Sequence, residues 1–299
     1  MPTVFYTDHF PLPLPPAHRF PIEKYELVRL ALIHEGILEE CDARPAPQAT
    51  SEDLAHAHSR EYVHAVLAGR LSRQQIRKIG FPWSPELVER SLASVGGTLA
   101  AVQEALHHGI SGNLAGGTHH ASSDEGEGFC VFNDQAVAAA QVLTRGDVKR
   151  VAIIDLDVHQ GNGTSAILGK DERVYIFSMH GANNYPSLKI PSSLDVGLPD
   201  GTTDDDYLDI LEACLPKVMA FKPDVVLYQA GVDPLGTDRL GKLALTHDGL
   251  VKRDDMVLRS VHAAGIPVAL ALGGGYGVPI SETIKAHVGT YKVVREVYG

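Results

Sequence analysis

The chain has 299 residues, of which 44% are hydrophobic and 21% are charged, and its formal net charge is −11. This composition is that of an ordinary globular protein and excludes disordered, collagenous and coiled-coil chains, while the acidic balance argues against general nucleic-acid binding. The longest uninterrupted hydrophobic run has five residues, so we expect no membrane span. The three cysteines form no CxxC pair, which excludes a thiolate zinc site and a redox pair. Without a secretory signal, we expect a cytoplasmic protein.

The first half of the chain is predicted to be mainly helical. Ser84 followed by Pro85 is typical of a helix start, and Gly109 of the same helix's end. The predicted elements are, in chain order, a strand at 3–6, helices at 21–38 and 84–107, a strand at 113–117 and a helix at 133–143.

The second half alternates short apolar runs with helical stretches. The runs are 151–155, 174–178, 225–229 and 268–272, and the helical stretches are 164–169, 204–221, 246–265 and a last one from 281. Apolar strands that alternate with helices favour parallel βαβ units covered on both faces. Because no linker or repeat interrupts the pattern, we predict a single α/β domain over residues 1–299.

Polar side chains follow four of the predicted strands. They are His119 and His120 after 113–117, Asp155, Asp157 and His159 at the end of 151–155, Asp233 after 225–229 and Tyr276 after 268–272. Ligands of open parallel sheets bind beyond the carboxyl ends of the strands. We therefore expect these side chains to form one site, although each alone is equally typical of a solvated strand end or of core packing.

Asp157 and His159 lie on one face of an extended chain, because side chains alternate along a strand. With Asp233 they would supply three protein ligands and leave a position for water, which is typical of a catalytic metal site. The tandem histidines predict a proton-transfer pair, with Asp155 and Asn162 available to fix the ring tautomers. A phenol such as that of Tyr276 could donate to a developing oxyanion.

Five motifs of the chain resemble those of zinc-dependent histone deacetylases and their bacterial relatives. In the same order as in that family, they are GGTHHA (116–121), GEGFCVFND (126–134), DLDVHQGNGT (155–164), DPLGTDRLG (233–241) and GGGY (273–276). The resemblance implies the arginase–deacetylase fold, a single parallel sheet of about eight strands between helices. The segment after Met179 and the stretch DRLGKLALT are most similar to class IV deacetylases, some relatives of which remove long fatty acyl groups.

The resemblance also implies a role for each matching residue. The implied zinc ligands are Asp157, His159 and Asp233, and the implied catalytic residues are His119, His120, Tyr276, Asp155 behind His119 and Asn162 behind His120. Because some members have aspartate where Asn162 stands, His120 is expected to be less basic. A monovalent-cation site, commonly potassium, is implied at Asp155, Asp157, His159, Ser178 and Met179, and a substrate channel at Gly128, Phe129, Tyr185, Leu240 and Gly274.

These roles imply an enzyme that removes an acetyl or longer acyl group from the ε-amine of lysine. One Zn²⁺ per chain is expected, with Fe²⁺ as the alternative, and K⁺ in a structural role. The expected partner is an acyl-lysine protein or peptide, or a small acylated amine. A rim aspartate that clamps the substrate backbone in peptide-binding members falls near Phe81, which argues against a protein substrate bound in the usual way.

Three rival functions remain open at this point. An acetylpolyamine deacetylase would use the same chemistry, and a non-catalytic acyl-lysine or polyamine binder would keep only the pocket. An arginase-type ureohydrolase needs a further carboxylate for a second metal, but Gln160 and Gly161 follow His159.

Overall fold

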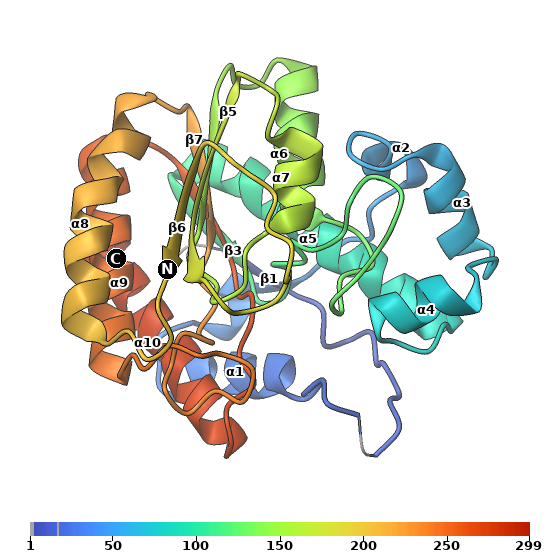
Figure 1. The fold of residues 1–299 in the computed structure, drawn as a ribbon, viewed down its shortest axis with the longest axis horizontal. Coiled ribbons are helices and arrows are strands. Elements are labelled where there is room, and N and C mark those ends of the chain that lie inside the picture. The colour runs from blue at the N-terminus through green and yellow to red at the C-terminus, as the bar shows by residue number, and fades with distance from the viewer. Residues whose placement is uncertain (1–2, 17) are drawn as a thin grey trace.

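The strands of the protein form one parallel sheet, as the computed structural model of residues 3–16 and 18–299 shows (Figure 1). Within that part of the chain the sheet has eight strands in the order β2-β1-β3-β8-β7-β4-β5-β6. Their bounds are β1 Val4–Tyr6, β2 Ala43–Pro45, β3 Ile110–Asn113, β4 Val151–Asp155, β5 Val174–Gly181, β6 Leu194–Leu198, β7 Val225–Gln229 and β8 Val268–Ala271. The predicted fold is thereby confirmed.

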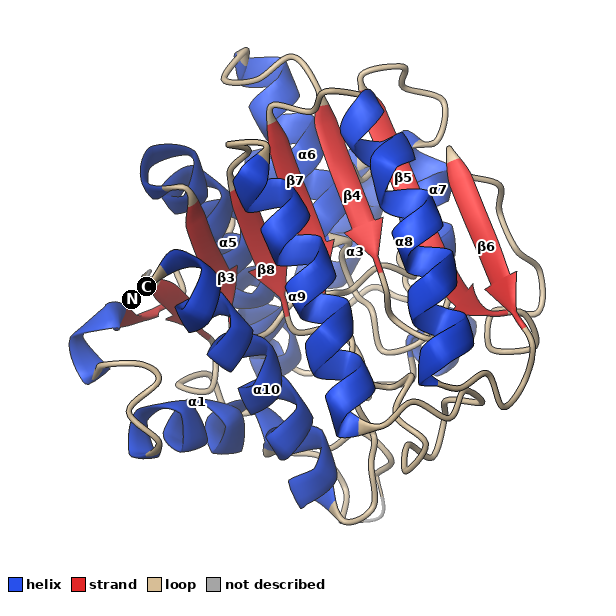
Figure 2. Ribbon diagram, turned by 90° about the vertical axis from the view of Figure 1, so that its left-hand side faces the viewer, coloured by secondary structure: helices blue, strands red, loops and turns tan. Residues whose placement is uncertain are grey.

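Helices cover both faces of the sheet, because its central strands are apolar on both sides (Figure 2). One face carries α1 Lys24–His34, α8 Asp204–Ala220, α9 His247–Ala263 and α10 Ile280–Tyr298. The other face carries α5 Pro85–His108, α6 Asp134–Arg145 and α7 Asn162–Leu168. The short helices α2 Ser51–Leu54, α3 Arg60–Leu67 and α4 Arg73–Ile79 lie beyond these, away from the sheet (Figure 1). None of the helices in the described part of the chain is both long enough and apolar enough to cross a membrane.

The helix signals in the sequence correspond to real caps. The Ser84 hydroxyl accepts a hydrogen bond from the backbone N–H of Leu87 at the start of α5, and Gly109 ends that helix in the left-handed conformation. Asn133 caps α6 in the same way. Each cap satisfies a backbone group that the helix itself leaves without a partner.

The structure corrects several boundaries. The strand predicted at 113–117 is β3, which ends at Asn113, and the residues after it already belong to the site loop. The helix predicted at 21–38 spans only Lys24–His34. The edge strands β2 and β6 and the short helix η1 Glu40–Asp42 had no prediction.

The register of the central strands brings the site together. Asp155 of β4 pairs with Gln229 of β7 and with Ser178 of β5, and Gln229 pairs with Ala271 of β8. Because these strand ends are level, the loops that follow β4, β7 and β8 leave the sheet side by side.

Candidate active site

Asp157, His159 and Asp233 form a buried cluster at this edge of the sheet. One ligand atom from each lies within 4.8 Å of the others. Nδ1 of His159 lies 3.0 Å from Oδ1 of Asp157 and 3.1 Å from Oδ2 of Asp233. Two carboxylates and one imidazole are a donor set that suits Zn²⁺ or Fe²⁺.

Backbone amides hold the two carboxylates of this cluster. Gly274 donates its N–H to Oδ2 of Asp157 at 2.7 Å, and Val158 donates to Oδ1 of Asp233 at 2.8 Å. A Cβ atom at position 274 would overlap the Asp233 carboxylate, so this close approach requires glycine. The loop that follows β8 therefore supports the cluster through the backbone N–H of Gly274 rather than through a side chain.

The electrostatics of the cluster favour a bound cation. Burial disfavours the charged imidazole, but hydrogen bonds and charges from Asp157 and Asp233 outweigh it and raise the pKa of His159 to about 10. Burial and the charge of Asp157 raise the pKa of Asp233 to about 7. Protons and a cation would therefore compete for the position between these side chains.

The two tandem histidines have different partners. Nδ1 of His119 donates to Oδ2 of Asp155 at 2.7 Å, whereas Nδ1 of His120 donates to Oδ1 of Asn162 at 2.7 Å. Their ring centroids lie 4.2 Å apart, and both side chains are buried. Each ring is therefore fixed through Nδ1 by one of the two partners proposed from the sequence.

The pKa values of the two histidines are shifted in opposite directions. Burial lowers the pKa of His119, but the charges of Asp155 and Asp157 overcome it and the net shift is upward. Burial, together with His119 and His159, holds the pKa of His120 well below its usual value. The low basicity expected for His120 therefore arises chiefly from burial and neighbouring charge, since the hydrogen bond to Asn162 acts in the opposite sense.

A cavity of about 440 Å³ is lined by the two tandem histidines and by Asp157 and His159. All of the residues expected to line a substrate channel border it, namely Gly128, Phe129, Tyr185, Leu240 and Gly274. Tyr276 also lines the cavity, and its ring centroid is 6.3 Å from that of Phe129. The ring of Tyr185 meets His120 edge-on at 5.0 Å, and 44% of the residue is exposed at the mouth.

The residues expected to bind a monovalent cation also lie together. Asp155 and Ser178 are paired on adjacent strands, and Ser178 and Met179 are buried. The backbone N–H of Asp157 donates to Oδ1 of Asp155 at 3.2 Å. The cation itself stays a prediction.

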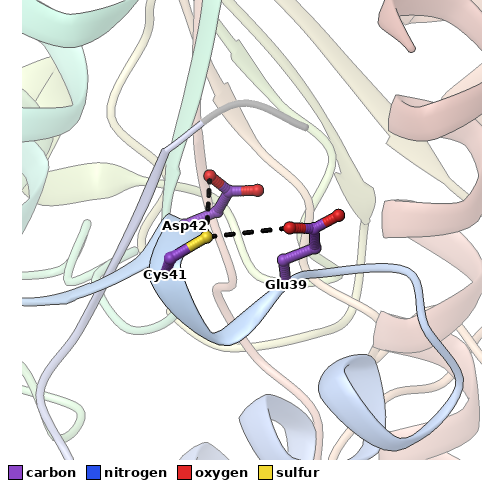
Figure 3. Close-up of side chains that lie close together, drawn as sticks. All are labelled: Glu39, Cys41 and Asp42. Carbon is purple, nitrogen blue, oxygen red and sulfur yellow. Dashed lines mark hydrogen bonds between the residues drawn. The ribbon is translucent and has the colours of Figure 1, made fainter.

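A second group of metal-type side chains lies far from the cavity. Glu39, Cys41 and Asp42 belong to or adjoin η1, and Figure 3 shows the Cys41 sulfur between the two carboxylates. The sulfur is 3.7 Å from Oε2 of Glu39 and 4.0 Å from Oδ1 of Asp42. Because Cys41 has no cysteine near it in the sequence, cysteine spacing gives no indication of this group.

Four further residues support the site without having been predicted. Lys24, buried in α1, donates from Nζ to the Gly273 carbonyl at 3.0 Å. Gln229 donates from its side-chain nitrogen to the Gly117 carbonyl at 3.3 Å, and Asp238 accepts a hydrogen bond from the backbone N–H of Tyr276. Glu127 accepts a hydrogen bond from Asn162. No local signal indicates any of them, since α1 also carries the polar residues Glu26 and Arg29.

Two further findings bear on the expected function. Phe81, at the expected rim position, is buried among Phe20 and Phe129 and offers no acidic clamp. The side chain of Gln160 bonds to Asp195 and the Ile190 carbonyl, so it adds no ligand to the Asp157 cluster.

Comparison with known proteins gives one consistent result. Residues 18–291 match the histone deacetylase domain. The chain is 43% identical to an uncharacterized protein of Picosynechococcus over 99% of both chains, and 34% identical to histone deacetylase 2 of Arabidopsis thaliana over 87% of this chain and 70% of that protein. A solved histone deacetylase homologue from Aquifex aeolicus has a TM-score of 0.83 at 25% identity, covering 97% of this chain and 82% of that one.

The fold and the matches together define a deacetylase, a hydrolase with the arginase–deacetylase fold. The chain belongs to the histone deacetylase family, whose members are generally metal-dependent.

Proposed function

We propose that this protein is a metal-dependent deacylase that releases lysine from its ε-N-acyl form. The observation that carries the proposal is that Asp157 and His159, which cluster with the buried Asp233, line one cavity together with two further histidines and a tyrosine. A binder without catalysis would need only the cavity. The paired histidines, each held by its own buried partner, favour an enzyme that moves protons.

The three ligand side chains would hold Zn²⁺ or Fe²⁺, which supplies a Lewis acid for the amide carbonyl and a more acidic water. His120, with its Nδ1 proton engaged by Asn162, keeps Nε2 free to accept a proton from that water. His119 carries the charge stabilised by Asp155 beside it. The Tyr276 hydroxyl would donate to the oxyanion that forms at the carbonyl, and the leaving amine would take a proton from the histidine pair.

The walls of the cavity suit an acylated lysine better than a polyamine. Phe129 and Tyr185 border the cavity with aromatic rings that can pack against an alkyl chain. Lys242 lines the cavity, and its ammonium group would repel a polycation.

The proposal is tested by offering the zinc-loaded and iron-loaded protein lysine peptides with acetyl, octanoyl and myristoyl groups, alongside acetylated polyamines. We expect release of free lysine from at least one acyl-peptide. Hydrolysis of the polyamines alone would establish the rival substrate class. Binding of every ligand without release of any acid, by a protein that holds one metal ion, would establish a non-catalytic binder.

A further inference from the structure

We propose that Glu127 is a positioning residue that selects the catalytic tautomer of His120, acting through the amide of Asn162. This inference rests on the proposed function, in which Nε2 of His120 accepts a proton. Neither the motifs nor the family match assigns a role to Glu127.

Three side chains form a short chain of hydrogen bonds behind the cavity. Oδ1 of Asn162 lies 2.7 Å from Nδ1 of His120, and Nδ2 of Asn162 donates to Oε1 of Glu127 at 2.6 Å. All three residues are at most 9% exposed. Water therefore competes little with these bonds, and each partner decides the orientation of the next.

The chemistry of the donors and acceptors fixes a single arrangement. An ionised carboxylate only accepts hydrogen bonds, so the NH₂ group of Asn162 must face Glu127. The amide oxygen of Asn162 then faces His120 and can only accept, so the ring proton lies on Nδ1. Nε2 is left with its lone pair toward the cavity, as a general base requires.

Asn162 cannot make this selection by itself. An amide presents a donor and an acceptor of nearly the same shape, and a reversed Asn162 would donate to Nδ1 of His120. The ring proton would then lie on Nε2, where it blocks proton abstraction. An aspartate at this position would need no second residue, because both of its oxygens accept.

An ion pair and a backbone hydrogen bond hold Glu127 in place. Its Oε2 lies 3.0 Å from Nζ of Lys78, which also pairs with Glu125. Burial, followed by the charge of the Glu127 carboxylate, raises the pKa of the Tyr185 hydroxyl. The backbone N–H of the next residue, Gly128, is bound by the Lys78 carbonyl, so the ion pair and the backbone fix Glu127 together.

The test compares Glu127→Gln with Glu125→Gln in the zinc-loaded protein. Both substitutions remove a carboxylate from Lys78, but only Glu127 contacts Asn162. We expect Glu127→Gln to lower kcat by roughly 10- to 100-fold with KM nearly unchanged, since general base catalysis is worth about 10²–10⁴-fold. Glu125→Gln should stay within about twofold of the native kcat. Equal losses in both variants would overturn the inference.

A rescue experiment separates positioning from simple structural support. Asn162→Asp alone places two carboxylates together and should lower kcat, whereas Asn162→Asp combined with Glu127→Gln should recover most of it. Losses that add in the double variant would contradict the proposed relay.

The ring tautomer can be measured without any turnover. Nitrogen NMR of ¹⁵N-histidine-labelled zinc-loaded protein, with His120 assigned by its loss in His120→Gln, should show the proton on Nδ1 in the native chain and a mixture in Glu127→Gln. An unchanged tautomer in Glu127→Gln would overturn the inference. A changed tautomer in a protein that hydrolyses no acyl-lysine would support the positioning role and reject the proposed function.

Discussion

The two groups of metal-type ligands in this protein lie in opposite surroundings. Asp157, His159 and Asp233 are buried and come from two strand ends, whereas Glu39, Cys41 and Asp42 lie within one turn at the surface (Figure 3). The buried carboxylates accept backbone N–H groups from Gly274 and Val158. Cys41 has only long contacts with its two neighbours.

The difference shows that proximity of ligand types is a weak indication of a site. Side chains that are close because they are neighbours in one turn keep their rotamer freedom and their water. Side chains that are brought together by the packing of separate strands arrive already desolvated and oriented. Only the second arrangement holds desolvated ligand groups close to one another without a neutralising charge. A bound cation removes the repulsion between them.

The largest expected effect is the loss of metal when one ligand is removed from the buried group. Removal of one ligand from the surface group is the comparison. Asp157→Ala should abolish metal binding and reduce deacylase activity to background, because two ligands from the buried set cannot hold the ion. Cys41→Ala should leave both unchanged. Elemental analysis of the two purified variants measures the metal directly, and normal metal content in Asp157→Ala would refute the assignment of the buried group.

A second substitution tests the catalytic step without removing a metal ligand. Tyr276→Phe should keep a full complement of metal and lose about 10²–10³-fold in kcat, the usual loss for one oxyanion donor. The measurement is steady-state kinetics alongside metal content. Native turnover in this variant would show that the oxyanion is stabilised by other groups.

Acidity should weaken metal binding at the buried group. Neutral His159 would be the ligand, and its raised pKa of about 10 means that a proton would have to leave when the ion binds below that pH. Apparent affinity should therefore rise with pH up to about 10, by roughly tenfold per unit for each proton released. Competition titrations against a chelator of known affinity at pH 6, 7 and 8 test the sign, and an affinity that falls with rising pH would contradict it.

The smallest expected effect comes from crowding the supporting backbone. Gly274→Ala should displace the Asp233 carboxylate and destabilise the fold by about 1–3 kcal/mol. Gly197→Ala, where the new methyl group meets only ordinary contacts, is the matched control. Denaturant unfolding of both variants measures the difference, which vanishes if the loop can shift to accept the methyl group.

Strands β4, β7 and β8 could be predicted from the sequence because they are apolar apart from the last residues of β4 and β7, whereas β3, which contains Ser111 and Asn113, was predicted three residues too late. The edge strands could not: β2 has three residues, and in β6 the exposed and less exposed positions alternate. Both depend on pairing with a neighbour rather than on their own composition.

The site residues that directly follow a strand were predictable for a similar reason, since parallel strands share one functional edge. Glu127 and Lys24 were not. Their contacts with Asn162 and the Gly273 carbonyl join residues 35 and 249 positions apart, and no local pattern specifies such a meeting.

His159 and Asp233 are 74 positions apart, which has a consequence for how the chain would acquire a metal ion. During synthesis Asp157 and His159 emerge long before Asp233, which reaches them only after β7 has docked beside β4. The three side chains would therefore form no complete binding site until that pairing has formed. Once bound, the ion would favour the native state by mass action, so that chelation should lower the melting temperature as well as the activity.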